Sequence, residues 1–127
     1  MLRKMSFAVL CAAAAISTNT HAMPSHSLQT GVTIEYELPP NEPQLFVNYM
    51  FWAVEANCKM KTPDDGNELF AEGVLKKGKI NGVSLAAGQT LSLVINNNVN
   101  LKLSAESGAK VKITNLGRHT VKAICTA

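Results

Sequence analysis

The sequence contains no long apolar run and few side chains suited to catalysis. Its longest apolar stretch, residues 6–16, is far shorter than the ~20 residues that cross a bilayer. Only two histidines, His26 and His119, follow residue 22, and the GxSxG and HExxH patterns are absent. Ser104, Glu106 and Ser107 are conceivable partners of His119, but their spacing forms no catalytic motif. We therefore expect no transmembrane segment and no enzyme.

An excess of positive charge is also missing from most of the chain. The formal net charge of +3 falls to +1 when Arg3 and Lys4 are set aside, because ten basic residues then face nine acidic ones. The remaining lysines are spread along the sequence between carboxylates. Binding to nucleic acid or to an anionic membrane needs a concentrated positive surface, so the sequence argues against both.

The first 22 residues have the pattern of a secretory signal peptide. Arg3 and Lys4 form a positive start, the apolar run follows, and the small residues before Ala22 suit cleavage. Residues 23–30 are polar and show no periodicity, which predicts a flexible leader. We expect a single domain over residues 31–127 and a periplasmic or secreted location.

Export leaves two cysteines, Cys58 and Cys125, in an oxidising compartment. A disulfide between them would close a long loop and stabilise the fold by roughly 4 kcal/mol in the chain-entropy model. The alternative is a pair of free thiols or metal ligands, which lacks CxxC spacing and nearby histidines. We expect the disulfide.

Short alternating segments between turns dominate the chain after residue 30. In residues 31–38, for example, Val32, Ile34, Tyr36 and Leu38 alternate with polar residues, which is the period of a half-buried strand. Similar segments are residues 68–75, 80–85, 89–95, 99–105, 109–114 and 119–126. Seven or eight such strands in this length, with one cystine, predict an all-β, antiparallel, immunoglobulin-like β-sandwich. A small closed β-barrel is the alternative.

Residues 46–61, FVNYMFWAVEANCKMK, form the most unusual passage. If these residues form one strand, the side chains at even positions face the core, and Trp52 and Cys58 contact the same layer of it. The odd positions place Val47, Tyr49 and Phe51 together in an apolar, aromatic patch on the opposite face. Two interpretations of this patch stay open: residues 39–45 (PPNEPQL) cover it, or a partner molecule binds it.

A metal site is an alternative function. If trimming removed Met23, the chain would begin Pro24-Ser25-His26, and a histidine third from a free amine suits square-planar copper. His119 is the other histidine available to such a periplasmic copper-binding protein.

Residues 101–125, LKLSAESGAKVKITNLGRHTVKAIC, resemble a segment of small exported, single-disulfide proteins from gram-negative gamma-proteobacteria. The resemblance extends back to WAVEANCKM at residues 52–60 and implies an exported module without catalytic residues or cofactor. Together with the aromatic patch, it leads us to expect an interaction or structural module that binds a protein partner or self-associates through Val47, Tyr49 and Phe51.

Overall fold

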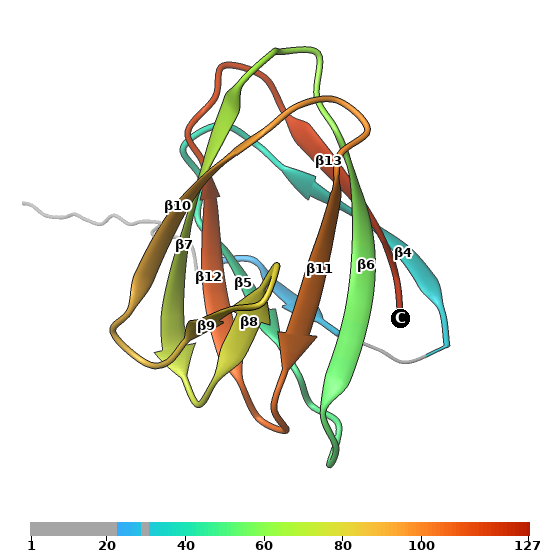
Figure 1. Ribbon diagram of the computed structural model, residues 1–127, viewed down its shortest axis with the longest axis vertical. Helices are drawn as coiled ribbons and strands as arrows, with labels where there is room; N and C mark the ends of the chain where they lie inside the picture. Colours follow the sequence, from blue (N-terminus) through green and yellow to red (C-terminus); the bar gives the residue numbers. More distant parts are fainter. Residues whose placement is uncertain (1–22, 29–30) are drawn as a thin grey trace, which may run out of the picture.

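The computed structural model describes residues 23–28 and 31–127, and the expected signal peptide lies outside them. Two β-sheets pack face to face, and the described residues contain no helix that could span a membrane. One sheet has the order β10-β7-β12-β5-β3 and the other β4-β13-β6-β11-β8-β9 (Figure 1). Because both sheets keep free edges, the fold is a sandwich and not a closed barrel.

The strands are short, as the alternating segments predict. The first sheet comprises β3 (Ser25–Ser27), β5 (Gln44–Val47), β7 (Asn67–Leu75), β10 (Thr90–Ile95) and β12 (Lys110–Asn115). The second comprises β4 (Thr33–Leu38), β6 (Val54–Lys61), β8 (Gly78–Ile80), β9 (Val83–Leu85), β11 (Asn100–Ala105) and β13 (Val121–Thr126). Neighbouring strands are antiparallel except β3 and β5. The all-β sandwich is confirmed.

The structure describes eleven strands, more than the expected seven or eight. One reason is residues 80–85, which form the hairpin of β8 and β9 and not a single strand. Asn81 and Gly82 both have positive φ angles, 51° and 82°, and such a pair makes a two-residue turn whose twist matches the strands.

The leader is also more ordered than expected at one point. Ser25–Ser27 add to the sheet as β3, in parallel register with Leu45–Val47 of β5. The prediction of a flexible leader over residues 23–30 did not include this strand. Strand addition at a sheet edge uses backbone hydrogen bonds, which need no apolar periodicity in the added segment.

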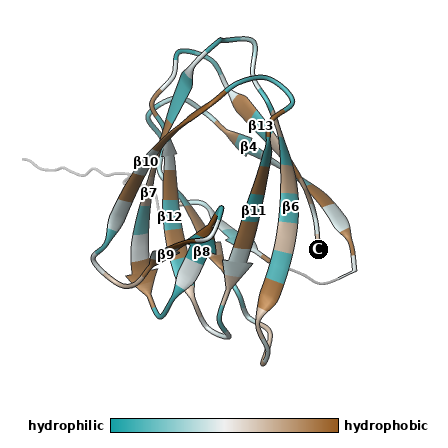
Figure 2. Ribbon diagram, viewed as in Figure 1, coloured by the Kyte–Doolittle hydropathy of each residue, from teal (hydrophilic) through white to brown (hydrophobic). Residues whose placement is uncertain are grey.

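The core lies between the sheets and is built from the inward side chain of every second residue. Along β6, Val54, Ala56, Cys58 and Met60 are buried and the residues between them are exposed, an alternation visible in Figure 2. Leu69 and Ala71 of β7 face them from the other sheet, 1% and 0% exposed. Burial of this apolar surface is the main favourable term in folding.

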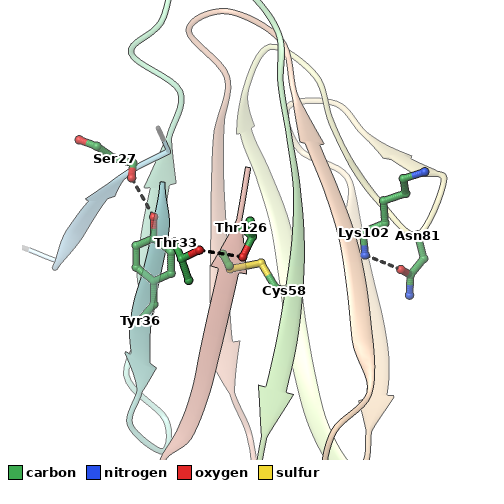
Figure 3. The surroundings of a disulfide bond; sticks show 8 residues. Ser27, Thr33, Tyr36, Cys58, Asn81, Lys102 and Thr126 are labelled. Carbon is green, nitrogen blue, oxygen red and sulfur yellow. Dashed lines mark hydrogen bonds between the residues drawn. A yellow bond between two sulfur atoms is a disulfide. The ribbon is translucent and has the colours of Figure 1, made fainter. Parts of the chain in front are cut away.

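The expected disulfide joins Cys58 of β6 to Cys125 of β13 (Figure 3). The two residues are direct partners on neighbouring strands, so the bond lies within one sheet. Both cysteines face the core, with 1% and 7% of their surface exposed. This cystine is structural, because burial keeps it from thiols in solution.

Candidate functional site

The passage that looked like one strand is two strands with a loop between them. β5 ends at Val47, β6 begins at Val54, and residues 48–53, which we name the aromatic loop, connect the two sheets. The loop protrudes below β6 at the lower end of Figure 1. The turn begins at Asn48, whose side-chain Oδ1 accepts a hydrogen bond from the backbone N–H of Met50 at 2.9 Å. Asparagine favours such turns because its amide replaces a backbone group.

Asn48 also fixes the aromatic loop to the rest of the molecule. Its side chain is completely buried, and Nδ2 lies 2.9 Å from the carbonyl oxygen of Trp52. The same nitrogen lies 3.1 Å from the carbonyl oxygens of Ala105 and Glu106. The carbonyls that bind this amide therefore belong both to the loop and to the turn between β11 and β12.

Further hydrogen bonds join the same two turns. The Asn48 N–H donates to the Ala109 carbonyl at 3.0 Å, and the Gly108 N–H donates to the Asn48 carbonyl at 2.9 Å. Ser107 Oγ donates to the Met50 carbonyl at 2.6 Å. The aromatic loop is thus held in one conformation, and a loop ordered in advance loses less entropy when it binds.

Large aromatic side chains project from this anchored backbone. Tyr49 is 65% exposed, Phe51 93% and Trp52 54%. Six aromatic residues follow residue 22, so half of them occupy this one loop. Scattered exposed apolar residues are ordinary, but a contiguous aromatic group on a fixed loop is a candidate contact site.

Two predictions about this passage are wrong. Trp52 does not lie in the core, because β5 ends at Val47 and the alternation of faces is interrupted. Val47 cannot belong to an exposed patch, because it is 2% exposed and lies on β5, which is paired with β3 and β12. Tyr49 and Phe51 remain candidates, now as loop residues and not as part of a sheet face.

In the structure, residues 39–45 do not cover the aromatic residues. The Asn41 N–H donates to the Asn115 carbonyl at 2.6 Å, and Asn115 is the last residue of β12. Val47 instead pairs with Lys110, the first residue of that strand. Residues 39–45 therefore begin at the opposite end of the sandwich from the aromatic loop.

Three lysines lie on the turns beside the aromatic loop. Lys76 and Lys77 form the turn between β7 and β8, and the Lys77 N–H donates to Glu106 Oε1 at 3.1 Å. The Lys76 side chain lies against Gly108 of the neighbouring turn. A methyl group at Gly108 would place its carbon 3.4 Å from the Lys76 Cε. Lys110 begins β12 and pairs with both Val47 and Leu75. Separate lysines in the sequence are therefore gathered at one end of the fold.

The two candidate metal ligands lie in separate surroundings. His26 Nε2 is 2.8 Å from Gln44 Oε1, and its ring packs 5.2 Å from the rings of Tyr36 and Phe46. His119 Nδ1 is 2.9 Å from Asp64 Oδ2. Across the described part of the chain, no three His, Cys, Asp or Glu side chains are grouped so that they could hold a metal.

His119 has a carboxylate partner that sequence reasoning did not find. Ser104, Glu106 and Ser107 lie near the aromatic loop, whereas His119 follows β12 at the other end of the sandwich. Asp64 also forms an ion pair with Arg118, whose Nη2 lies 3.8 Å from Asp64 Oδ1. Among residues 23–28 and 31–127, no serine, threonine or cysteine is hydrogen-bonded to the His119 ring, whose partner is Asp64.

Asn48, Trp52 and the lysine group are the other site features that the sequence analysis missed. The signal available was an asparagine in the middle of an apolar run, where it favours a turn over a continuous strand. No family model, curated protein or solved structure matches this chain.

Proposed function

We propose that this protein is an exported, non-enzymatic contact module, and that the aromatic loop is its contact surface. The observation that carries the proposal is the combination of 65% and 93% exposed aromatic rings at Tyr49 and Phe51 with a backbone fixed by the buried Asn48. Aromatic side chains supply a large contact area at a small cost in side-chain entropy, which is why they dominate binding surfaces.

Export is supported by two features of the chain. The first 22 residues have the pattern of a signal peptide. The disulfide between Cys58 and Cys125 is of the kind that persists in oxidising compartments such as the periplasm or the extracellular space. The copper-binding alternative gains no support from the separate surroundings of His26 and His119.

The experiment compares retention of matched variants on washed cell envelopes, which carry both lipids and envelope proteins. The test variant is Tyr49→Ser with Phe51→Ser. The control is Val83→Ser with Val94→Ser, which removes two apolar side chains that are 48% and 65% exposed outside the loop. Each protein is recovered from outside the cytoplasm, and intact mass establishes its N-terminus.

We expect the wild type and the control to sediment with envelopes and the test variant to lose at least about tenfold in retention, since each lost aromatic contact is worth ~1 kcal/mol or more. Chemical denaturation should give the same midpoint for all three, because surface changes usually alter stability by less than ~0.5 kcal/mol. Equal retention of the test variant and the control would refute the proposal.

A further inference from the structure

The chemistry of the aromatic loop and its surroundings narrows the kind of surface that it contacts. The tip presents Tyr49, Met50, Phe51 and Trp52 in succession, so apolar rings and a thioether stand beside a phenol and an indole. Tyrosine and tryptophan are enriched where one end of a side chain is in an apolar phase and the other in water, as at the boundary of a bilayer.

The shape of the molecule at this end also suits a flat, deformable surface. The loop protrudes beyond the adjoining strands, and its neighbours at the same end are the β7–β8 and β11–β12 turns (Figure 1). Leu75, 44% exposed, adds apolar surface where β7 enters its turn. The hydrogen bonds of Asn48 and Ser107 hold the tip of the loop away from the sandwich in the unbound protein.

The charges around the tip are predominantly positive. Lys76 and Lys77 form the β7–β8 turn and Lys110 begins β12, and the β11–β12 turn between them carries one carboxylate, Glu106. Farther up the second sheet, Glu55 and Lys79 both pair with Ser104 and offset each other. Lysines next to an apolar tip are placed to meet the headgroups of anionic lipids. The expectation against an anionic membrane rested on the spread of lysines along the sequence, whereas these three lysines lie at one end of the fold.

Within residues 23–28 and 31–127, three apolar cavities between the sheets are small for an aromatic side chain of a second copy. The apolar cavities between the sheets have volumes of about 10, 30 and 20 Å³. An engineered cavity that binds benzene has a volume of roughly 150 Å³, so these three cavities are too small for the Phe51 ring. The wider surface hollow at Asp64, Asp65 and Glu68, of about 230 Å³, carries three carboxylates and is unsuited to an aromatic ring.

We infer that the aromatic loop inserts into the interface of an anionic lipid bilayer, with Tyr49 and Phe51 entering the boundary region and Lys76, Lys77 and Lys110 contacting the headgroups. The inference rests on the proposed function and names the partner class of the same surface. It requires no change of fold, because the loop is already exposed and anchored.

The experiment uses pure lipid vesicles, which contain no protein. Vesicles of phosphatidylcholine alone are compared with vesicles containing phosphatidylglycerol, at low and at raised salt. Trp52 is the only tryptophan in the chain and lies in the loop, so its emission reports insertion directly. Flotation of the exported protein with vesicles gives an independent measure of binding.

Three variants separate the contributions. Phe51→Ser removes the most exposed ring. Lys76→Asn with Lys77→Gln removes two charges, and asparagine is chosen because Lys76 has a φ of 55°, which asparagine tolerates. Lys59→Gln with Lys102→Gln is the matched control, because both lysines are exposed on the sheet and outside the turns beside the tip.

We expect binding to the anionic vesicles with a blue shift of the Trp52 emission, and weaker binding at raised salt. Phe51→Ser should weaken binding by about tenfold or more, from the lost apolar burial. The Lys76 and Lys77 changes should weaken it by about 25-fold on anionic vesicles, since each lysine near such a surface contributes roughly fivefold. The control should bind nearly as the wild type does.

Two results would overturn this inference. Absence of binding to pure lipid, while retention on envelopes still depends on Tyr49 and Phe51, would assign the loop to a protein partner and leave the proposed function standing. Vesicle binding that is unaffected by Phe51→Ser would place the lipid contact in another segment. If neither vesicles nor envelopes respond to loop variants, the proposed function fails as well.

Discussion

The two ends of the sandwich are built on the same principle and display opposite chemistry. At one end the buried Asn48 ties the aromatic loop to the β11–β12 turn. At the other end the buried Asn115 ties the loop after β12 to neighbouring segments, through hydrogen bonds from Nδ2 to the carbonyls of Leu38 and His119, both at 2.8 Å. Each asparagine is 0% exposed. A buried amide therefore fixes the backbone at both ends.

The side chains displayed on the two fixed backbones differ. The first end presents Tyr49 and Phe51, whereas the second presents Arg118 and His119 around the carboxylate of Asp64. Charged groups at the second end bind one another, and exposed pairs of this kind contribute little to stability. From this comparison we expect the anchoring residues to contribute to stability and the displayed residues to determine what each end contacts.

The largest expected effect is at Asn115, whose side chain binds the buried side chain of Asn67 as well as backbone groups. Asn115 Oδ1 also accepts from Asn67 Nδ2 at 2.9 Å and from the Gly117 N–H at 2.8 Å. Asn115→Ala would leave several buried polar groups unsatisfied and should lower the free energy of unfolding by about 4 kcal/mol. Denaturation by urea measures this loss. A loss below ~1 kcal/mol would contradict the anchoring role.

A smaller and more local effect is expected at the other anchor. Asn48→Ala should lower the free energy of unfolding by about 2 to 3 kcal/mol, because buried carbonyls lose their donor. Hydrogen exchange should accelerate in residues 48–53 and 105–109 and remain slow in β7. Uniform acceleration over the whole sandwich would mean that Asn48 supports the core in general and does not hold the loop.

The smallest of the three effects is expected at a displayed side chain. A tryptophan in a core costs about 3 to 5 kcal/mol when it is replaced by alanine. Trp52 is 54% exposed, so Trp52→Ala should cost only about 1 to 2 kcal/mol. Urea denaturation followed by circular dichroism makes the comparison. A cost equal to that of Asn115→Ala would place Trp52 among the anchoring residues and break the distinction between the two groups.

Local pattern was sufficient for most of the strands. Residues 31–38, 99–105 and 119–126 alternate strictly enough that β4, β11 and β13 follow from period two alone. The same alternation predicted that Cys58 and Cys125 face inward. Their pairing was predicted from the expected export and from the presence of only two cysteines after residue 22. β3 could not be found this way, because an edge strand held by backbone bonds leaves no side-chain pattern.

The aromatic loop shows where local pattern fails. Phe46 to Met60 alternates well enough to pass for one strand, and that interpretation buried Trp52 and exposed Val47. The break at Asn48 depends on carbonyl groups of residues 105 and 106, which are 57 and 58 positions away in the sequence. Such partners exist only when the β11–β12 turn has been brought beside the loop.

The sequence by itself determined the all-β class, the single cystine and most strand positions, because each rests on residue types and on a two-residue period within one segment. Only the tertiary structure decided that Tyr49 and Phe51 are exposed on a fixed loop, that Val47 is covered and that Lys76, Lys77 and Lys110 meet at one end. Burial and charge density depend on which turns the sheet brings together in space, and that arrangement is not contained in any single segment of the chain.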